Sequence, residues 1–311
     1  MTRRRLATIT SEFGSGKRES HDASAFYNRF NSPRISDEAL VSPPAAIDTL
    51  FHGDAAAMTD KQVADNSVAL VVTSPPYFAG KEYETDLAEG HVPASYVEYL
   101  QILTGVFAVC VDKLESGGRI AVNVANLGRK PYRSLSADVV RILQDELGLL
   151  LRGEVIWQKA KGAGGSCAWG SYRSPQNPVL RDITERVVIA SKGRFDRAIK
   201  RDERKTLGLP SESTIETDEF LEATLDVWEI PSESARKIGH PAPFPTALPR
   251  RLIELYTYRS DLVLDPFVGS GTTAVAAIET GRHYVGFDTD NSYLAIARDR
   301  IGAATSGLSR K

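Results

Sequence analysis

The chain has 311 residues, with 38 Lys and Arg against 40 Asp and Glu, which gives a formal net charge of −2. Hydrophobic residues make up 42% and charged residues 25%, the composition of a globular protein that is large enough to bury a core. The near-zero charge excludes a polycationic, histone-like protein. It does not exclude nucleic-acid binding, because that depends on where the positive charges lie.

Location and cofactor chemistry are also bounded by composition. No apolar run approaches the roughly 20 residues that a membrane span needs, and the N-terminus lacks the apolar core of a signal peptide. Two cysteines, Cys110 and Cys167, are too few for a disulfide framework or a zinc cluster. These features predict a cytoplasmic protein that needs no metal and has no membrane attachment.

Residues 1–45 are predicted to form a weakly ordered N-terminal arm, because they are rich in Ser, Arg, Asn and Pro and poor in apolar residues. Positions 1–34 carry seven basic residues against three acidic ones. The arm is either a solvated tail or a segment that contacts phosphates.

Residues 46–190 alternate apolar runs of strand length with apolar residues at helical spacing. The run Val68–Thr73 is continuously apolar, as expected of a strand buried on both faces of a parallel sheet. Strands are predicted at 47–52, 68–73, 119–124, 154–158 and 186–190, and helices at 96–114 and 135–147. Strands that alternate with helices predict a mostly parallel α/β sheet covered on both faces.

Residues 191–235 interrupt this alternation and are predicted to be an insertion on the sheet scaffold. Seven basic residues occur within 191–205 against three acidic ones, whereas 211–231 holds seven acidic residues and no basic one. The alternation resumes in 236–304, with strands predicted at 262–265 and 284–288 and helices at 248–256, 272–279 and 292–301; 305–311 is predicted to be a tail.

A glycine-rich turn, DPFVGSGT at 265–272, follows one of these strands and precedes a helix. Glycines there let backbone amides approach a ligand at a helix N-terminus, although such turns also occur for purely steric reasons. The next strand ends at Asp288, where a carboxylate can accept hydrogen bonds from ribose hydroxyls. Together the two features predict a nucleoside-binding half-sheet, and the absence of a full G-x-G-x-x-G pattern disfavours NAD.

A second motif, TSPPY at 73–77, follows the buried strand directly. Its two prolines cannot continue a strand ladder, so the strand ends there with a constrained backbone. A hydroxyl, free carbonyl groups and an aromatic ring are thereby presented at the carboxyl edge of the sheet, where α/β proteins bind ligands.

These two motifs, in this order, resemble the catalytic and cofactor motifs of the β-class amino-methylating DNA methyltransferases, the N4/N6 DNA methylase family. The resemblance extends over about residues 48–302 and includes EVIWQK at 154–159 and HPAPFPTALP at 240–249. It implies a Rossmann-like S-adenosylmethionine-dependent methyltransferase sheet that is circularly permuted, with the catalytic motif before the cofactor motif. It also implies a catalytic half of the domain at 46–190 and a cofactor half at 236–304. The insertion at 191–235 is the candidate target-recognition region because the scaffold does not need it, and a plain solvated run of charges is the alternative.

The resemblance assigns S-adenosyl-L-methionine as the cofactor. Its methionine end would be lined by the glycine-rich turn, its ribose held by Asp288, and the ligand covered by the loop before residue 249. The implied cofactor residues are Asp265, Phe267, Gly269, Gly271, Thr272, Asp288, Phe244 and Thr246, with Asp54 as a further candidate.

The implied reaction uses a base that leaves the DNA stack. Ser74 and the Pro75 carbonyl would accept hydrogen bonds from the exocyclic amine and aim its lone pair at the methyl group, with Pro76 fixing the backbone. Tyr77 would stack on the base. Cytosine C5 methylation needs a cysteine nucleophile, typically one that follows proline, and neither cysteine follows a proline.

The base itself is predicted from Ser74. Adenine enzymes of this family usually carry Asp or Asn at that position, and TSPPY matches the cytosine-N4 form, so cytosine N4 is favoured and adenine N6 is the alternative. The predicted DNA contacts lie around the glycine-rich loop at 164–178 and are Lys159, Lys161, Trp169, Tyr172 and Arg173. The predicted partners are double-stranded DNA, a cognate restriction endonuclease and a second copy of the chain.

Overall fold

The computed structural model describes residues 35–76, 95–126, 132–159, 170–180, 182–232 and 244–308. Within them the strands are β1 (Thr49–His52), β2 (Val68–Thr73), β3 (Leu114–Val124), β4 (Leu150–Gln158), β5 (Thr184–Ser191), β6 (Val227–Glu229), β7 (Leu262–Asp265) and β8 (His283–Asp288). The helices are η3 (Ala55–Ala57), α3 (Tyr96–Lys113), α4 (Leu135–Arg141), η4 (Ile142–Glu146), α5 (Arg201–Thr206), α6 (Thr217–Ala223), α8 (Ala247–Tyr256), α9 (Thr272–Glu279) and α10 (Asn291–Leu308).

The strands form one eight-stranded sheet in the order β1-β8-β7-β2-β3-β5-β4-β6. Neighbouring strands from β1 to β3 are parallel, whereas β5 is antiparallel to both β3 and β4. Strand β2, from the first half of the chain, lies beside β7, from its last quarter. The carboxyl ends of the two motif-bearing strands therefore meet at the same edge of the sheet.

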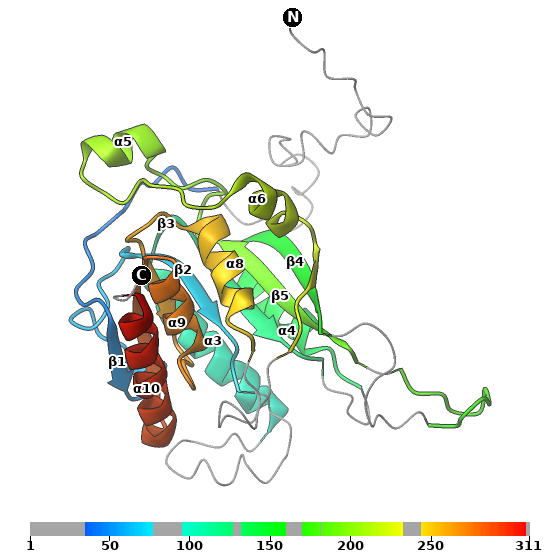
Figure 1. The fold of residues 1–311 in the computed structure, drawn as a ribbon. Coiled ribbons are helices and arrows are strands. Elements are labelled where there is room, and N and C mark those ends of the chain that lie inside the picture. The colour runs from blue at the N-terminus through cyan, green and yellow to red at the C-terminus, as the bar shows by residue number, and fades with distance from the viewer. Residues whose placement is uncertain are drawn as a thin grey trace, which may run out of the picture.

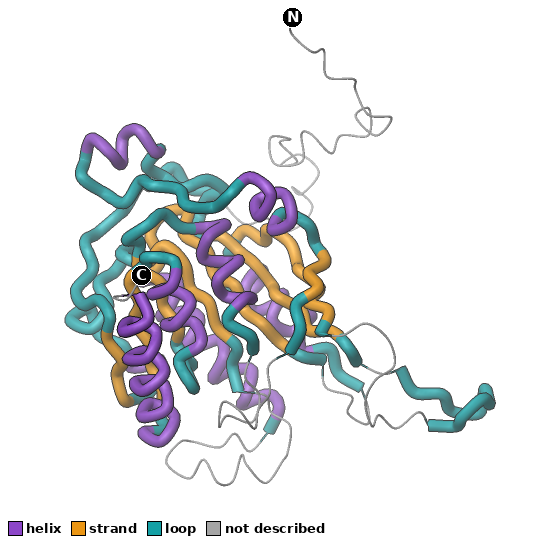
Figure 2. The backbone as a smooth tube through the Cα atoms, in the orientation of Figure 1, coloured by secondary structure: helices purple, strands orange, loops and turns teal. Residues whose placement is uncertain are grey.

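Helices cover both faces of the sheet, as the alternating pattern predicts. Figure 1 shows α8, α9 and α10 on one face and α3 and α4 on the other, and the strands between the two helical layers stand out in Figure 2. Each interface holds a hydrophobic cluster, centred on Phe107 and Ile120 on the α3 side and on Leu252 and Val263 on the α8 side. No described helix has the length and apolar character that would let it cross a bilayer.

Most predicted elements are confirmed, with differences at their ends. Strand β3 begins at Leu114, five residues before its predicted start at 119, and includes Gly117 and Gly118. Gly117 has φ +79°, and a Cβ there would lie 1.9 Å from the Asp196 carbonyl oxygen. A glycine is thus needed at this position, because the backbone of the insertion passes directly beside it. Helix α10 continues through Leu308, past the predicted start of the tail at 305.

Part of the predicted N-terminal arm is held against the sheet. Ser36 donates from its backbone to the Gly193 carbonyl at 2.6 Å, and Leu40 and Ser116 are joined by two hydrogen bonds of 3.0 Å. Residues 36 and 40 of the predicted arm are therefore bonded to the folded unit, and residues 1–34 lie outside the described part.

Candidate active site

The two sequence motifs meet through a buried hydrogen bond. Thr73, the last residue of β2, donates from Oγ1 to Asp265 Oδ1 at 2.7 Å, although the two residues are 192 positions apart. Asp265 ends β7, and its Oδ1 also accepts from the backbone N–H of Phe267 at 3.1 Å. The Ser-Pro-Pro segment and the glycine-rich turn consequently start side by side at the carboxyl edge.

The glycine-rich turn folds back onto the neighbouring strand. Gly269 and Gly271 have φ of +48° and +78°, which a β-carbon disfavours, and a Cβ on Gly271 would lie 2.9 Å from the Ala297 Cβ. Arg300 of α10 donates from Nη1 to the Ser270 carbonyl at 2.6 Å and to Thr272 Oγ1 at 3.0 Å. The conformation of the turn therefore depends on its glycines, and α10 holds it in place through Arg300.

Asp288 lies next to this turn, at the end of β8. Its Oδ2 accepts from the Gly269 N–H at 2.8 Å and its Oδ1 from the Asp290 N–H at 2.9 Å. Its backbone carbonyl accepts from Gly53 N–H at 2.9 Å, which brings the end of β1 to the same place. Asp54 is exposed there and accepts from the Ala56 N–H at 2.8 Å, so it caps η3.

Both carboxylates carry perturbed pKa values. Burial raises the pKa of Asp265 to about 6, and the nearby Asp288 adds to the rise. Burial also raises the pKa of Asp288. Their hydrogen-bond partners in the described chain are hydroxyl and backbone N–H groups. One buried and one half-buried carboxylate, both bonded to neutral donors, form a site that suits a cationic ligand.

The proposed catalytic segment starts one residue beyond Thr73. Ser74 is half-buried, Pro75 is buried and Pro76 is exposed. The pairing of Thr73 with Val122 places Ser74 opposite the next residue of β3, which is Asn123. Tyr77 lies outside the described residues.

The loop predicted to cover the ligand is described only from its last part. Phe244 is half-buried and packs against the hydrophobic cluster on the α8 side, which includes Leu70 and Val72 of β2. Thr246 precedes α8 and is also half-buried. Both residues therefore lie near the α8 face of the sheet, next to β2.

A polar network that the sequence motifs did not reveal continues along the same edge. Asn123, only 2% exposed, donates from Nδ2 to Glu185 Oε2, and the other Glu185 oxygen pairs with Lys159. Asn123 Oδ1 has no hydrogen-bond partner among the described residues. The sequence signal was weak: Asn123 follows the apolar run 120–122, and Glu185 is one of several polar residues at the start of β5. Lys159 was expected to contact DNA, and here it is bound to a buried carboxylate.

Residues 170–180, the described part of the connection between β4 and β5, project from this edge of the sheet (Figure 1). This part is held together by a bridge between Gly170 and Pro178 and by the Asn177 N–H donating to Ser171 Oγ at 2.7 Å. Tyr172 is 67% exposed, and Arg173 has φ +53°. Both predicted DNA contacts are therefore presented to solvent, and Lys161 and Trp169 lie outside the described residues.

The basic half of the predicted recognition region does not reach this edge. The Gly117 N–H donates to the Lys192 carbonyl at 2.9 Å, which fixes the segment to the amino edge of the sheet. Arg204 is 1% exposed and bonds to Glu115 and Asp261, and Arg197 pairs with the same two carboxylates. Arg197 and Arg204 are therefore held in buried ion pairs and do not present their guanidinium groups to solvent.

Comparison with known proteins identifies the family of the chain. Residues 68–299 match the family model for DNA methylases of the N6/N4 type. The chain is 28% identical over 270 residues to the type II methyltransferase M.ScaI of Streptomyces caespitosus, covering 83% of each chain. It is 27% identical over 312 residues to the type II methyltransferase M.Cfr9I of Citrobacter freundii, covering 90% of this chain and 97% of that one.

Solved structures give the same result. A protein of Thermus thermophilus, described as a candidate DNA modification methylase and solved with S-adenosyl-L-methionine, aligns with a TM-score of 0.61 and 25% identity, covering 83% of this chain and 96% of its own. The cytosine-N4-specific PvuII DNA methyltransferase shares the fold, with a TM-score of 0.61 and 22% identity. The family match spans both motif-bearing strands and the sheet between them, and the chain belongs to the N6/N4 DNA methylase family.

Proposed function

We propose that this protein is a site-specific DNA methyltransferase that moves a methyl group from S-adenosyl-L-methionine to the N4 amine of a flipped-out cytosine. The observation that carries the proposal is the Thr73–Asp265 hydrogen bond, which joins the strand that precedes Ser74 and Pro75 to the start of the glycine-rich turn. A methyl donor at the turn and an amine at the Ser-Pro-Pro segment would then be neighbours. The family match and the methyltransferase relatives support the same reaction class.

The carboxylates fit the cofactor by their chemistry. Asp265 is buried and faces neutral donors, so it suits the cationic methionine end, with Phe267, Gly269, Gly271 and Thr272 forming the turn around it. Asp288 retains lone pairs for ribose hydroxyls after accepting two backbone N–H groups. Phe244 and Thr246 would cover the ligand from the α8 side, and Asp54 would stand at its outer end. The cofactor supplies an electrophilic methyl group.

The chain's own residues orient the acceptor. The exocyclic amine is a weak nucleophile because its lone pair is delocalised into the ring. Ser74 Oγ and the Pro75 carbonyl accept its two N–H groups and direct the lone pair toward the methyl group, while Pro76 holds the backbone in place. Tyr77 stacks on the base. Asn123 Oδ1, one strand away and held in position by Glu185 and Lys159, is a second candidate acceptor for the N–H group that is assigned to Ser74.

The choice of base rests on Ser74, the position where adenine enzymes of this family usually carry Asp or Asn. Adenine N6 is the alternative for the same architecture. The deciding experiment incubates duplex DNA with the protein and cofactor, digests the DNA to nucleosides and separates them by mass spectrometry. N4-methylcytosine is expected, and N6-methyladenine as the sole product would overturn the choice of base. A Ser74→Ala sample controls for contaminating activity.

Double-stranded DNA would be contacted by the projecting β4–β5 connection, with Tyr172 and Arg173 at its described tip and Lys161 and Trp169 in the same segment. A restriction endonuclease that cuts the same sequence is the expected functional partner, and the protein would act in the cytoplasm. Cells that express the gene should yield DNA resistant to such an enzyme. A homodimer is the expected assembly, and sedimentation equilibrium at the mass of one chain would dismiss it.

A further inference from the structure

A cluster of buried charges lies at the amino edge of the sheet, opposite the candidate active site. Three buried arginines, Arg119, Arg197 and Arg204, stand there with two buried carboxylates, Glu115 and Asp261. Both carboxylates are shared by Arg197 and Arg204. The cluster therefore has one more positive charge than negative charges, and the excess charge belongs to Arg119.

Arg119 has no carboxylate partner in the described part of the chain. It is 8% exposed, and its Nε has no hydrogen-bond partner among the described residues. Its Nη2 donates to the Phe195 carbonyl at 3.0 Å, and its guanidinium lies 5.6 Å from the centre of the Tyr256 ring. Burial, followed by repulsion from Arg197 and Arg152, lowers the pKa of Arg119 to about 10. A buried cation without a counterion is costly, so the site favours an anion.

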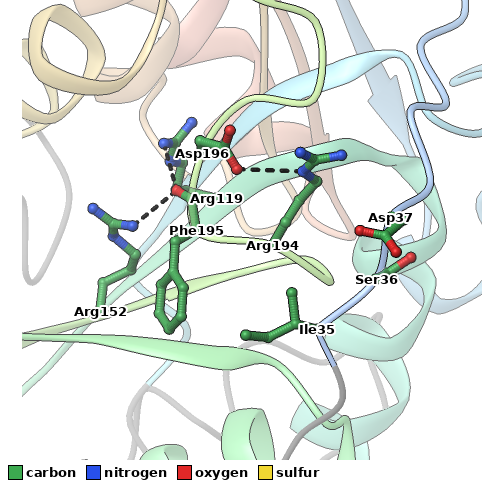
Figure 3. Close-up of a pocket in the computed structure, with 8 residues that line it drawn as sticks. All are labelled: Ile35, Ser36, Asp37, Arg119, Arg152, Arg194, Phe195 and Asp196. Atoms are coloured by element: carbon green, nitrogen blue, oxygen red, sulfur yellow. Dashed lines mark hydrogen bonds and ion pairs between the residues drawn. The ribbon is translucent and has the colours of Figure 1, made fainter. Parts of the chain in front are cut away.

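A cavity of about 460 Å³ opens next to this arginine. Figure 3 shows Arg119 and Arg152 both directed at the Phe195 carbonyl, with Arg194 on another wall. Arg152 donates to that same carbonyl at 2.8 Å. The two acids of the lining, Asp37 and Asp196, are exposed, and Asp196 is paired with Arg194 at 3.3 Å. Neither acid neutralises Arg119.

We propose that this cavity binds a small organic molecule through a phosphate or carboxylate group held by Arg119 and Arg152. Guanidinium groups match the geometry of both oxyanions. The Phe195 ring and Ile35 provide an apolar wall beside the arginines, so a ligand with an apolar body fits better than a bare ion. The cavity lies at the amino edge of the sheet, whereas Ser74 and Asp265 lie at the carboxyl edge. Its ligand is therefore distinct from the methyl donor and from the target base.

Calorimetric titrations with inorganic phosphate, phenyl phosphate and benzoate, at constant ionic strength set with chloride, test the proposal. Phenyl phosphate should bind more tightly than inorganic phosphate, and benzoate should show whether a carboxylate suffices. Arg119→Met should weaken binding by about tenfold or more, because it removes hydrogen bonds to a charged group. The matched control is Lys205→Met, which removes an exposed charge from the same part of the chain and should bind as the parent does.

Unfolding of each variant followed by circular dichroism shows whether it is folded. If Arg119→Met does not fold, Arg152→Met, whose side chain is only half-buried, takes its place and should also weaken binding. Absence of binding of all three anions to the parent protein, or equal affinity for the parent and the folded arginine variants, would overturn the proposal. If duplex DNA displaces phenyl phosphate equally from the parent and from Lys205→Met, the proposal of a small organic ligand is overturned. The cavity would then be assigned to a DNA phosphate.

Discussion

At the scale of single residues, Asp265 joins the two halves of the candidate site. Its carboxylate accepts from Thr73 and from the Phe267 backbone, yet burial still raises its pKa to about 6. A carboxylate with a raised pKa costs stability when it is ionised. We interpret this cost as the consequence of a site built for a cationic ligand, in which the ligand provides the missing positive charge.

This interpretation predicts a pH dependence. The folded-state pKa of Asp265 exceeds its ordinary value of 3.8, so the destabilisation is absent below that pH and complete above about pH 6. The free energy of unfolding of the parent, relative to Asp265→Asn, should fall as the pH rises through this window. Urea unfolding at pH 4 to pH 8 measures the difference, and a difference that is independent of pH would contradict it. The same variant should bind S-adenosylmethionine more weakly by calorimetry.

Ser74 and Asp288 are predicted to fail in different ways. Ser74→Ala should lower the rate of methyl transfer by about 100-fold, the usual size of one lost transition-state hydrogen bond, and leave cofactor affinity unchanged. Asp288→Ala should instead weaken cofactor binding, because the carboxylate also holds the Gly269 N–H of the turn. Single-turnover kinetics and cofactor calorimetry on both variants separate the two roles. Identical defects in the two variants would refute this division.

At the scale of elements, the insertion at 191–235 is part of the scaffold more than an appendage. Its basic half lies at the amino edge with Arg197 and Arg204 buried, and its β6 adds a strand to the sheet beside β4. The hydrogen bonds of this segment to β3, β4 and the α8–β7 turn would not be needed by an independent recognition module. The segment therefore stabilises the sheet.

Glu115 provides the test of this structural role. Glu115→Gln leaves three buried arginines with one carboxylate, so the free energy of unfolding should fall by about 3–5 kcal/mol. Glu212→Gln, which removes an exposed partner of Arg259, should change it by less than about 1 kcal/mol. Urea unfolding of both variants gives the comparison. A loss at Glu115 as small as that at Glu212 would show that the cluster does not hold the insertion.

At the scale of the whole molecule, the net charge of −2 conceals a separation of charge. The connection at 159–181 holds four basic residues and no acidic one, whereas 211–231 holds seven acidic residues and no basic one. The described part of this connection, which carries Arg173, projects from the edge that carries Ser74, and the basic residues of the insertion lie at the opposite edge. DNA should therefore bind along the β4–β5 connection.

The salt dependence of DNA binding tests this placement. The logarithm of affinity should fall linearly with the logarithm of the salt concentration. Arg173→Gln should reduce the magnitude of that slope by about 1, because one phosphate contact is lost. Lys205→Gln removes the same charge at the opposite edge and should leave the slope unchanged. Fluorescence anisotropy of labelled duplex DNA measures both. A larger effect from Lys205 than from Arg173 would place the DNA on the insertion.

Most elements of the sheet scaffold, the two motifs and the resemblance to the family could be predicted from the sequence, because helical and strand periodicity, glycine turns and proline breaks are local properties. The short elements α5, α6 and β6 of the insertion were not predicted. The sequence also predicted which strand ends carry Ser74, Asp265 and Asp288. The partners of the polar side chains depend on the folded chain: Thr73 pairs with Asp265 across 192 residues, and the arginines of the insertion pair with Glu115 and Asp261. A run of basic residues reads the same whether it is solvated or buried. The difference depends on carboxylates that are distant in the sequence, and only folding brings these within hydrogen-bonding distance.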